Sequence, residues 1–545
     1  MAATLDTTSP PPLKTRPSSW SRPAAVVDAV VSALDGGGDR LWTSRLNPLH
    51  QSGTLAIASF AVLVVTGIYL FLFYSIDDPY RSVSRIDTDL VGGSWIRSLH
   101  TYAADLALVA TAVHALKMFL AGRSFGPRRR AWLTGVVLLG ITLLCGWTGQ
   151  VMAWDLQGQV VAVELTRLLD LLPVFSMPMG RAFDGLAPVP GSFFFMNLFL
   201  HVCLPLGIAL VLWLHLSRTA RPALAPPGPV LVTALGALIV LSAVLRVPLA
   251  SPAELLAIPR DVPVDLLYNF WLPAAWKLGP AWHAALWAIA AATFLSVPWW
   301  WKRSRPVLAP SWVDPDHCTG CTTCYKDCPF DAITMVARPD PGRRSEFHAL
   351  VNPERCVSCG ICAGSCAPMS VGPPGRTGRE QLRRAHGLEP VPGGIIVYAC
   401  AQNDASMDAR LSALPGITVR PVECAGGLHT SVVDLALRSG ADGVLVLACA
   451  PRIAPCREGA KWLHERLYND REAELPPRID KRRVALAAFS RGEWPAIERA
   501  VADLREAVRD LPETAPLRSV APSADATAAF EPEVECEPDR KVSRG

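Results

Sequence analysis

Six long apolar stretches occupy the first half of this chain, and each is long enough to cross a bilayer as a helix, which takes about 20 residues. After the sixth stretch, apolar runs become short and are separated by polar and glycine-rich segments. The pattern predicts an all-α membrane bundle of six spans, followed by smaller soluble domains. The stretches are roughly 52–74, 97–120, 131–153, 192–217, 228–248 and 279–301.

Basic residues gather in alternate loops between these stretches, whereas the remaining loops are acidic or mixed. The positive-inside rule places the basic loops in the cytoplasm. We therefore expect a multi-pass protein of a bacterial-type inner membrane, with both termini cytoplasmic. The basic residues are Arg40 and Arg45, then Arg123, Arg128, Arg129 and Arg130, then Arg218 and Arg221, and finally Lys302, Arg303 and Arg305.

Two of the apolar stretches carry histidine pairs with the same spacing, His100 with His114 and His201 with His215. Fourteen residues are close to four helical turns, so each pair lies on one face, separated by about 21 Å of rise. Antiparallel packing would set His100 opposite His201 and His114 opposite His215. A lone membrane histidine is usually a hydrogen-bonded polar residue between helices. Two matched pairs instead favour two bis-imidazole sites for b-type haems, in a four-helix dihaem core.

Glycines repeat at the same interval on two further stretches, Gly53 with Gly67 and Gly135 with Gly149. A haem face needs room that only a residue without Cβ leaves, although membrane glycines alone usually mark helix packing. We expect these four glycines to pack against the haems.

The 15 cysteines and the small net charge of +4 narrow the function classes. The charge gives no reason to expect nucleic acid. Most cysteines form two runs of four, and a proline follows each run closely. Zinc ribbons also use pairs of cysteines at this spacing, but their pairs do not continue to a third and fourth cysteine followed by proline. The runs are Cys318, Cys321, Cys324 and Cys328, and then Cys356, Cys359, Cys362 and Cys366. Thiolate ligands need a reducing compartment, which agrees with a cytoplasmic second half.

A third unit follows, in which apolar strands at 394–400, 419–424 and 443–449 alternate with helical periodicity at 428–438 and 457–469. This alternation predicts a small parallel sheet, and ligands gather at the carboxyl ends of such strands. The cysteines there are Cys400, Cys424 and Cys449, with Cys456 close behind.

The expected fold is therefore multidomain: a helical membrane bundle, an α+β dicluster unit and a small α/β domain. The expected boundaries are a disordered leader at 1–24, the membrane domain at 25–305, the dicluster domain at 306–370, a linker at 371–392, the α/β domain at 393–508 and a disordered tail at 509–545.

The membrane half resembles the cytochrome b of quinol–cytochrome c reductases and of their photosynthetic counterpart, on the glycine and histidine pairs and on Leu204–Pro205. The resemblance implies that His100 and His201 ligate the outer haem, and His114 and His215 the inner one. It also implies that Arg97 and Lys117 pair with haem propionates. Interfacial snorkelling is the alternative for Lys117.

The same resemblance directs attention to the quinol pocket of that family, where Pro-Glu-Trp-Tyr precedes the last matched span. Here the stretch from Pro263 reads Pro-Val-Asp-Leu-Leu-Tyr, so Asp265 and Tyr268 are the candidate quinone-site residues. The tryptophan and the family's last two spans are absent. An amphipathic loop lying on the membrane is the alternative interpretation.

The cysteine runs resemble bacterial two-cluster ferredoxins, in which the last cysteine of each run ligates the other cluster. The resemblance implies one 4Fe–4S cluster on Cys318, Cys321, Cys324 and Cys366, and another on Cys356, Cys359, Cys362 and Cys328. The third unit resembles the delta subunit of methyl-viologen-reducing hydrogenase, which implies a 2Fe–2S cluster on Cys400, Cys424, Cys449 and Cys456. Asn403 replaces a cysteine expected there, so buried small residues at strand ends are the alternative.

Together these features predict an electron-transfer subunit of a respiratory-chain oxidoreductase. It would connect membrane quinone with a cytoplasmic flavoprotein that resembles the flavoprotein of heterodisulfide reductase. Further dehydrogenase subunits are expected, and membership of a homodimer and the direction of electron flow stay open. Two alternatives remain: a bc-like quinol oxidase with a Rieske partner, and a membrane anchor that conducts electrons without its own quinone site.

Overall fold

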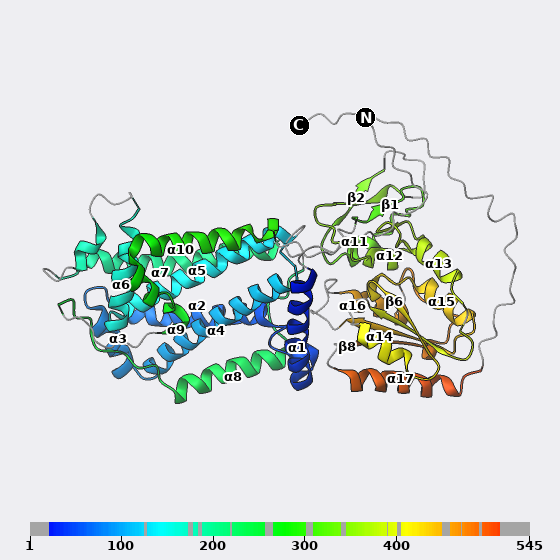
Figure 1. Ribbon diagram of the computed structural model, residues 1–545, viewed down its shortest axis with the longest axis horizontal. Helices are drawn as coiled ribbons and strands as arrows, with labels where there is room; N and C mark the ends of the chain where they lie inside the picture. The colour runs from blue at the N-terminus through cyan, green and yellow to red at the C-terminus, as the bar shows by residue number, and fades with distance from the viewer. Residues whose placement is uncertain are drawn as a thin grey trace.

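The computed structural model describes residues 21–124, 128–172, 178–183, 188–217, 221–256, 265–300, 309–338, 345–389, 391–400, 405–449, 458–469, 471–489 and 493–512. A helical half and a half with small sheets lie end to end (Figure 1). We call residues 21–300 the membrane half, 309–372 the cysteine-run unit and 391–512 the α/β unit.

Five helices are long and apolar enough to cross a membrane. Large apolar side chains on them are exposed, such as Val65 at 70% and Leu206 at 68%. Water-soluble proteins rarely expose so much apolar surface, whereas lipid-facing helices require it. This half is therefore a multi-pass membrane domain. Its spanning helices are α2 (Ser52–Phe73), α4 (Gly93–Leu120), α5 (Arg129–Ala153), α7 (Gly191–Ser217) and α10 (Leu272–Trp300).

The stretch 228–248 forms a shorter helix than predicted, α8 (Gly228–Val244), with 17 residues. Its length is about 26 Å, against a hydrocarbon core of about 30 Å. Beyond its C-terminal end, the Val247 amide donates to the Ser98 hydroxyl at 3.0 Å, near the start of α4. Five spans are shown, and the sixth crossing stays a prediction.

Further helices lie at the ends of the bundle. They are α1 (Ser21–Leu46), α3 (Pro79–Thr88), α6 (Leu156–Leu169), the 3-10 helix η2 (Met179–Phe183) and α9 (Leu266–Asn269). α1 stands across the ends of the spanning helices, beside the sheet-containing half (Figure 1). It begins at Ser21, inside the leader predicted at 1–24, and residues 1–20 lie outside the described part.

The cysteine-run unit consists of two antiparallel strand pairs with short helices after the cysteine loops. β1 (Trp312–Val313) pairs with β4 (Val371–Gly372), and β2 (Ile333–Ala337) pairs with β3 (Phe347–Val351). The helices are α11 (Thr323–Asp327) and α12 (Ile361–Gly364). Four cysteines lie in its buried core beside Ile333 and Ala349, so the sulfur atoms form part of the core: Cys324, Cys328, Cys362 and Cys366.

The stretch predicted as a linker, 371–392, contains regular structure. Helix α13 (Gly378–His386) starts with a capping box, in which Thr377 and Glu380 bond to each other's backbone amide. This signature satisfies free amides at a helix start even in a segment rich in Gly, Pro and Arg.

The α/β unit contains the predicted parallel sheet, with strand order β6-β5-β7-β8. The strands are β5 (Ile395–Cys400), β6 (Ile417–Val422), β7 (Gly443–Cys449) and β8 (Val484–Phe489). Helices α15 (Thr430–Arg438) and α16 (Gly459–Tyr468) cover one face, and α14 (Ala405–Ser412) and α17 (Trp494–Arg509) the other. The 3-10 turns are η3 (Ala425–Gly427) and η4 (Lys481–Arg483). The central strands are buried on both faces, so the cysteines that end them are held in a fixed frame.

Candidate functional site

The two histidines of α4 lie against the two glycines of α2. A Cβ at Gly53 would lie 2.9 Å from Nδ1 of His114, and one at Gly67 would lie 3.3 Å from Cε1 of His100. The first glycine meets the second histidine, so α2 and α4 run antiparallel. A side chain at either position would push against the imidazole, so the glycines keep these faces open.

The same arrangement recurs between α5 and α7. A Cβ at Gly149 would lie 2.9 Å from Cε1 of His201, and one at Gly135 would lie 3.4 Å from Cε1 of His215. Cys145, which had no predicted role, also lies here, because its carbonyl is 3.1 Å from Nδ1 of His201.

The histidines of the two helix pairs face each other in two layers. His100 is close enough to His201 for their charges to interact, and His114 is similarly close to His215. Lys117 and Arg123 are electrostatic neighbours of His114, so the second layer is nearer the basic loop after α4. The arrangement presents one imidazole pair at each of two depths. Because the first histidine of α4 meets the first of α7, these two helices run in the same direction, and the antiparallel packing expected from the sequence is wrong.

Threonine hydroxyls orient three of the four imidazoles, and the sequence reasoning missed them. Thr66, Thr134 and Thr148 lie 2.8, 3.0 and 3.1 Å from Nδ1 of their histidines. Each hydroxyl donates its hydrogen to a carbonyl one turn earlier in its own helix, at 2.8, 3.0 and 3.0 Å. It must therefore accept from Nδ1–H, which leaves Nε2 with a free lone pair for a metal.

A repeated dipeptide is the sequence signal for these hydroxyls, since Ser or Thr precedes each of the four glycines. The exclusion of Cβ atoms and the fixed Nδ1 protons both fit axial ligation of two haems. The serine of the fourth dipeptide, Ser52, is buried.

The two cysteine runs interlock. The electrostatic neighbours of Cys366 include Cys321 of the first run, whereas Cys328 neighbours Cys356 of the second. This is the crosswise placement expected for two cubane clusters. Backbone amides donate to sulfur at 3.3 Å at three positions, Ala332 to Cys328, Ser370 to Cys366 and Ser311 to Cys356.

Burial makes these thiols poor acids, raising the pKa of Cys362 to about 12 and that of Cys359 well above its ordinary value. Thiolates therefore form here only together with a bound cationic group. Within the described ranges, no three ligating side chains are close enough for a single metal ion. A four-iron cluster holds its cysteines at its corners, so its ligands lie farther apart than those of a single metal ion.

The strand-end cysteines of the α/β unit also gather. Sγ of Cys400 is 3.0 Å from Sγ of Cys449, at the carboxyl ends of neighbouring strands. Cys424 directly precedes the turn η3 and is an electrostatic neighbour of Cys359. Cys456 and Asn403 lie outside the described residues. Three of the four predicted 2Fe–2S ligands therefore share one edge of the sheet, next to the second cysteine run.

Comparison with known proteins divides the chain in the same way. Residues 38–220 match the family model for cytochrome b/b6/petB, residues 317–368 that for the 4Fe–4S dicluster domain, and residues 395–512 that for the methyl-viologen-reducing hydrogenase delta subunit. The chain is a membrane-bound subunit for electron transfer. A solved structure titled "Hyperthermophilic respiratory Complex III" is similar at 18% identity and a TM-score of 0.38, covering 46% of this chain and 75% of that one.

In the cytochrome b part, both predicted propionate partners are engaged with carboxylates of this chain. Nε of Arg97 lies 2.7 Å from Asp87, and Nζ of Lys117 lies 2.8 Å from Asp35 of α1. Lys117 also contacts Nδ1 of His50 at 2.8 Å. Pairing with propionates would require these cations to share or exchange their carboxylate partners, and the role stays a prediction.

The candidate quinone-site residues both form hydrogen bonds within the protein. Asp265 caps α9 by accepting from the Leu267 amide at 2.9 Å, and it accepts from Gln150 at 2.9 Å. Tyr268 is buried at 4% exposure and donates to the carbonyl of Ala104 at 2.9 Å. Asp105 of α4, which no sequence motif indicated, is an electrostatic neighbour of both residues.

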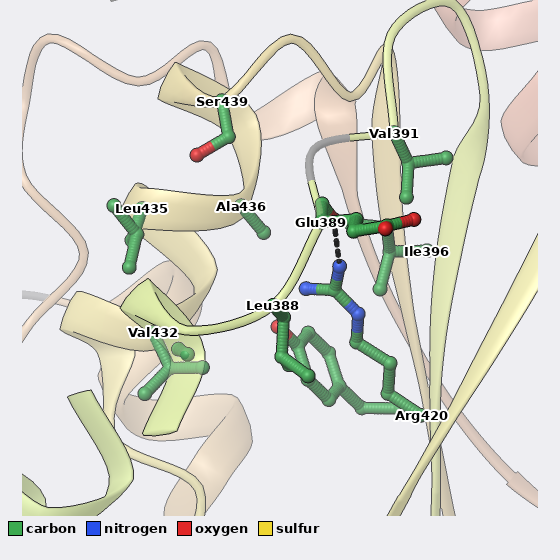
Figure 2. A pocket seen from close by; sticks show the side chains of 11 residues that line it. Leu388, Glu389, Val391, Ile396, Arg420, Val432, Leu435, Ala436 and Ser439 are labelled. Carbon is green, nitrogen blue, oxygen red and sulfur yellow. Dashed lines mark hydrogen bonds between the residues drawn. The ribbon is translucent and has the colours of Figure 1, made fainter. Parts of the chain in front are cut away.

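A small pocket in the delta-subunit-like part lies apart from all these groups. Its lining includes Ile396 and Tyr398 of β5 and Val432 of α15, and Arg420 donates to the carbonyl of Glu389 at 2.8 Å across it (Figure 2). Most of its lining residues are apolar and none is a cysteine or a histidine, so it is separate from the candidate redox sites.

Proposed function

We propose that this chain is the membrane subunit of a multi-subunit oxidoreductase and carries electrons between the quinone pool and a cytoplasmic flavoprotein. The carriers would be two b haems, two 4Fe–4S clusters and one 2Fe–2S cluster, which supply one-electron chemistry when bound. The observation that carries the proposal is the double layer of imidazoles, each against a glycine and three with Nδ1 held by a hydroxyl.

The chain's residues would keep the haem sites dry and oriented. Four glycines leave space for planar groups at two depths, and the surrounding apolar helices exclude water. The threonine bonds fix three of the four rings and increase their basicity toward a metal, as outer-shell partners of metal-binding histidines usually do.

Contacts between the halves support onward transfer into the cysteine-run unit. Arg221, in the connection after α7, donates to the carbonyl of Lys326 and lies 3.7 Å from Asp331. The guanidinium of Arg128 lies 5.7 Å from the ring centre of Phe330. These partners flank Cys328, so the basic loops of the membrane half lie next to a predicted cluster ligand.

The next transfer would lead from the cysteine-run unit into the α/β unit. A Cβ at Gly427 would lie 3.0 Å from the carbonyl of Gly360, which shows how closely the loop after Cys424 approaches the loop after Cys359. The delta-subunit-like part would then exchange electrons with the flavoprotein, with all iron–sulfur parts and both termini cytoplasmic.

At the outer end of the bundle, Asp265 and Asp105 would accept protons from quinol, with Tyr268 beside them. A specific observation favours a second candidate function, an electron-conducting anchor without an outer quinone site. Asp265 already caps a helix, and the Tyr268 hydroxyl is already bonded to a carbonyl.

The two functions are separated by adding a quinol analogue to the purified complex and following haem absorbance. The proposal expects haem reduction that is strongly slowed in Asp265→Asn and Asp105→Asn, whereas Asp89→Asn, an exposed carboxylate outside the spans, serves as the control. If no quinol reduces the haems, only the conduit function remains. Co-purification of a Rieske protein in place of a flavoprotein would favour the bc-like alternative.

A further inference from the structure

Arg466 of α16 is the largest side chain with no exposed surface in the described part of the chain. Arginine is rarely buried to this degree unless it is paired. Burial lowers the pKa of its guanidinium to about 10, and the charge of Asp327 opposes this change. The side chain therefore keeps its positive charge at neutral pH.

The guanidinium joins the two iron–sulfur units through direct hydrogen bonds. Nη1 donates to the Ser365 hydroxyl of the cysteine-run unit at 2.7 Å, and Nη2 donates to the carbonyl of Gly426 in the α/β unit at 2.7 Å. Ser365 in turn donates to the buried carboxylate of Asp327 at 2.7 Å. Arg471 also pairs with Asp327, so this network holds two cations and one anion.

The network touches the backbone beside three predicted iron–sulfur ligands. Asp327 directly precedes Cys328, and Ser365 directly precedes Cys366. Gly426 follows Cys424, which is an electrostatic neighbour of Arg466. One buried positive charge thus lies among ligands assigned to three different centres.

Two glycines shape the space around this charge. A Cβ at Gly364 would lie 2.7 Å from Nη2 of Arg466, and one at Gly426 would overlap the backbone of Gly459. A second buried contact crosses the same boundary, from Nε2 of His429 to the carbonyl of Cys366 at 3.2 Å.

We propose that Arg466 is a charge-tuning and positioning residue at this boundary, which favours the reduced state of the centres bound by Cys424, Cys328 and Cys366. The inference rests on the proposed function, since it needs those centres to be present. Each centre gains one negative charge when it accepts an electron. A fixed cation in a medium of low dielectric stabilises that charge, and net charge is one of the levers that set cluster potentials.

The test is an EPR-monitored redox titration of the full-length protein, with dithionite as reductant, on wild type and Arg466→Gln. Glutamine keeps a hydrogen-bond donor and removes the charge. At the potential where the wild-type centre is half reduced, the ratio of reduced to oxidised centre should fall about tenfold, most for the centre at Cys424. Arg466→Lys should stay close to wild type.

Arg483→Gln is the matched control, since Arg483 is also buried and donates to the carbonyl of Asp442 at 2.9 Å, at the opposite end of the strands. An unchanged ratio in Arg466→Gln with full iron content, or an equal change in Arg483→Gln, would overturn the inference. If Arg466→Gln loses iron, the same titration is carried out on Asp327→Asn. Removing this anion should raise the reduced fraction of the centres. An unchanged or lowered fraction contradicts the proposal. A wild-type protein without any iron–sulfur signal would instead remove the proposed function itself.

Discussion

The membrane half and the cysteine-containing half assemble their predicted ligand sets in opposite ways. Each haem layer joins helices far apart in the sequence, and its geometry depends on how closely α2 packs on α4 and α5 on α7. Each cysteine run supplies most ligands of one cluster from a few neighbouring residues in a single loop. Haem binding should therefore be sensitive to changes along helix faces, and cluster binding to changes in the cysteine loops.

Removing one axial histidine should separate the behaviour of the two halves most clearly. His201→Leu should lower the haem content from two to about one per chain while the iron–sulfur signals stay, since the layers are separate. Pyridine haemochrome absorbance measures the content. His283→Leu is the matched control, because His283 is a buried membrane histidine that stacks on Trp271 outside both layers. Equal haem loss in both variants would contradict the assignment.

The corresponding change in the other half is Cys359→Ala. It should remove about four irons per chain and leave both haems, because a cubane cluster needs each of its cysteines. Iron analysis combined with haem quantification checks this. Cys203→Ala, in a spanning helix, should retain all the iron. Loss of haem in Cys359→Ala would mean that the two halves do not bind their cofactors independently.

Glycine substitutions sharpen the dependence on helix packing, because the four positions differ in clearance. Gly149→Ala places its Cβ 2.9 Å from His201, whereas Gly135→Ala leaves 3.4 Å to His215. Overpacking costs about 1–3 kcal/mol, so Gly149→Ala should weaken haem retention by about tenfold or more, and Gly135→Ala by much less. Haem loss during dilution into apomyoglobin reports the order, and the reverse order would count against the packing model.

The smallest effect is expected from the hydroxyls. Thr66→Val removes the 2.8 Å contact to His100, and loss of such an outer-shell partner typically weakens metal affinity by about tenfold. Thr142→Val is the control, since the Thr142 hydroxyl bonds only to the carbonyl of Leu138 among the contacts described. The potential of the outer haem should shift in the first variant and stay in the second.

Strong periodicity made most of the architecture predictable. The matched spacing of histidines and glycines predicted four helices around two depths, but it did not predict that α2 packs on α4 and α5 on α7. The strand-end cysteines were also placed well, since Cys400 and Cys449 end strands that are apolar throughout. β8 was missed because Val484–Phe489 follows directly on the charged turn Lys481–Arg483.

Features that depend on side-chain partners could not be read from periodicity. The capping box at Thr377 was hidden in a segment whose composition suggested a linker. The burial of Arg466 depends on Ser365 and Gly426, which are far from it in sequence. The engagement of Asp265 with Gln150 likewise appears only once α9 packs against α5.

The central claim is that the paired imidazoles of α4 and α7 bind two haems in separate layers. Low-temperature EPR of the oxidised full-length protein, combined with a haem-to-protein ratio, tests it most directly. We expect two b haems per chain, both low-spin with two histidine ligands. A single haem, or a high-spin signal that shows an open axial position, would contradict it.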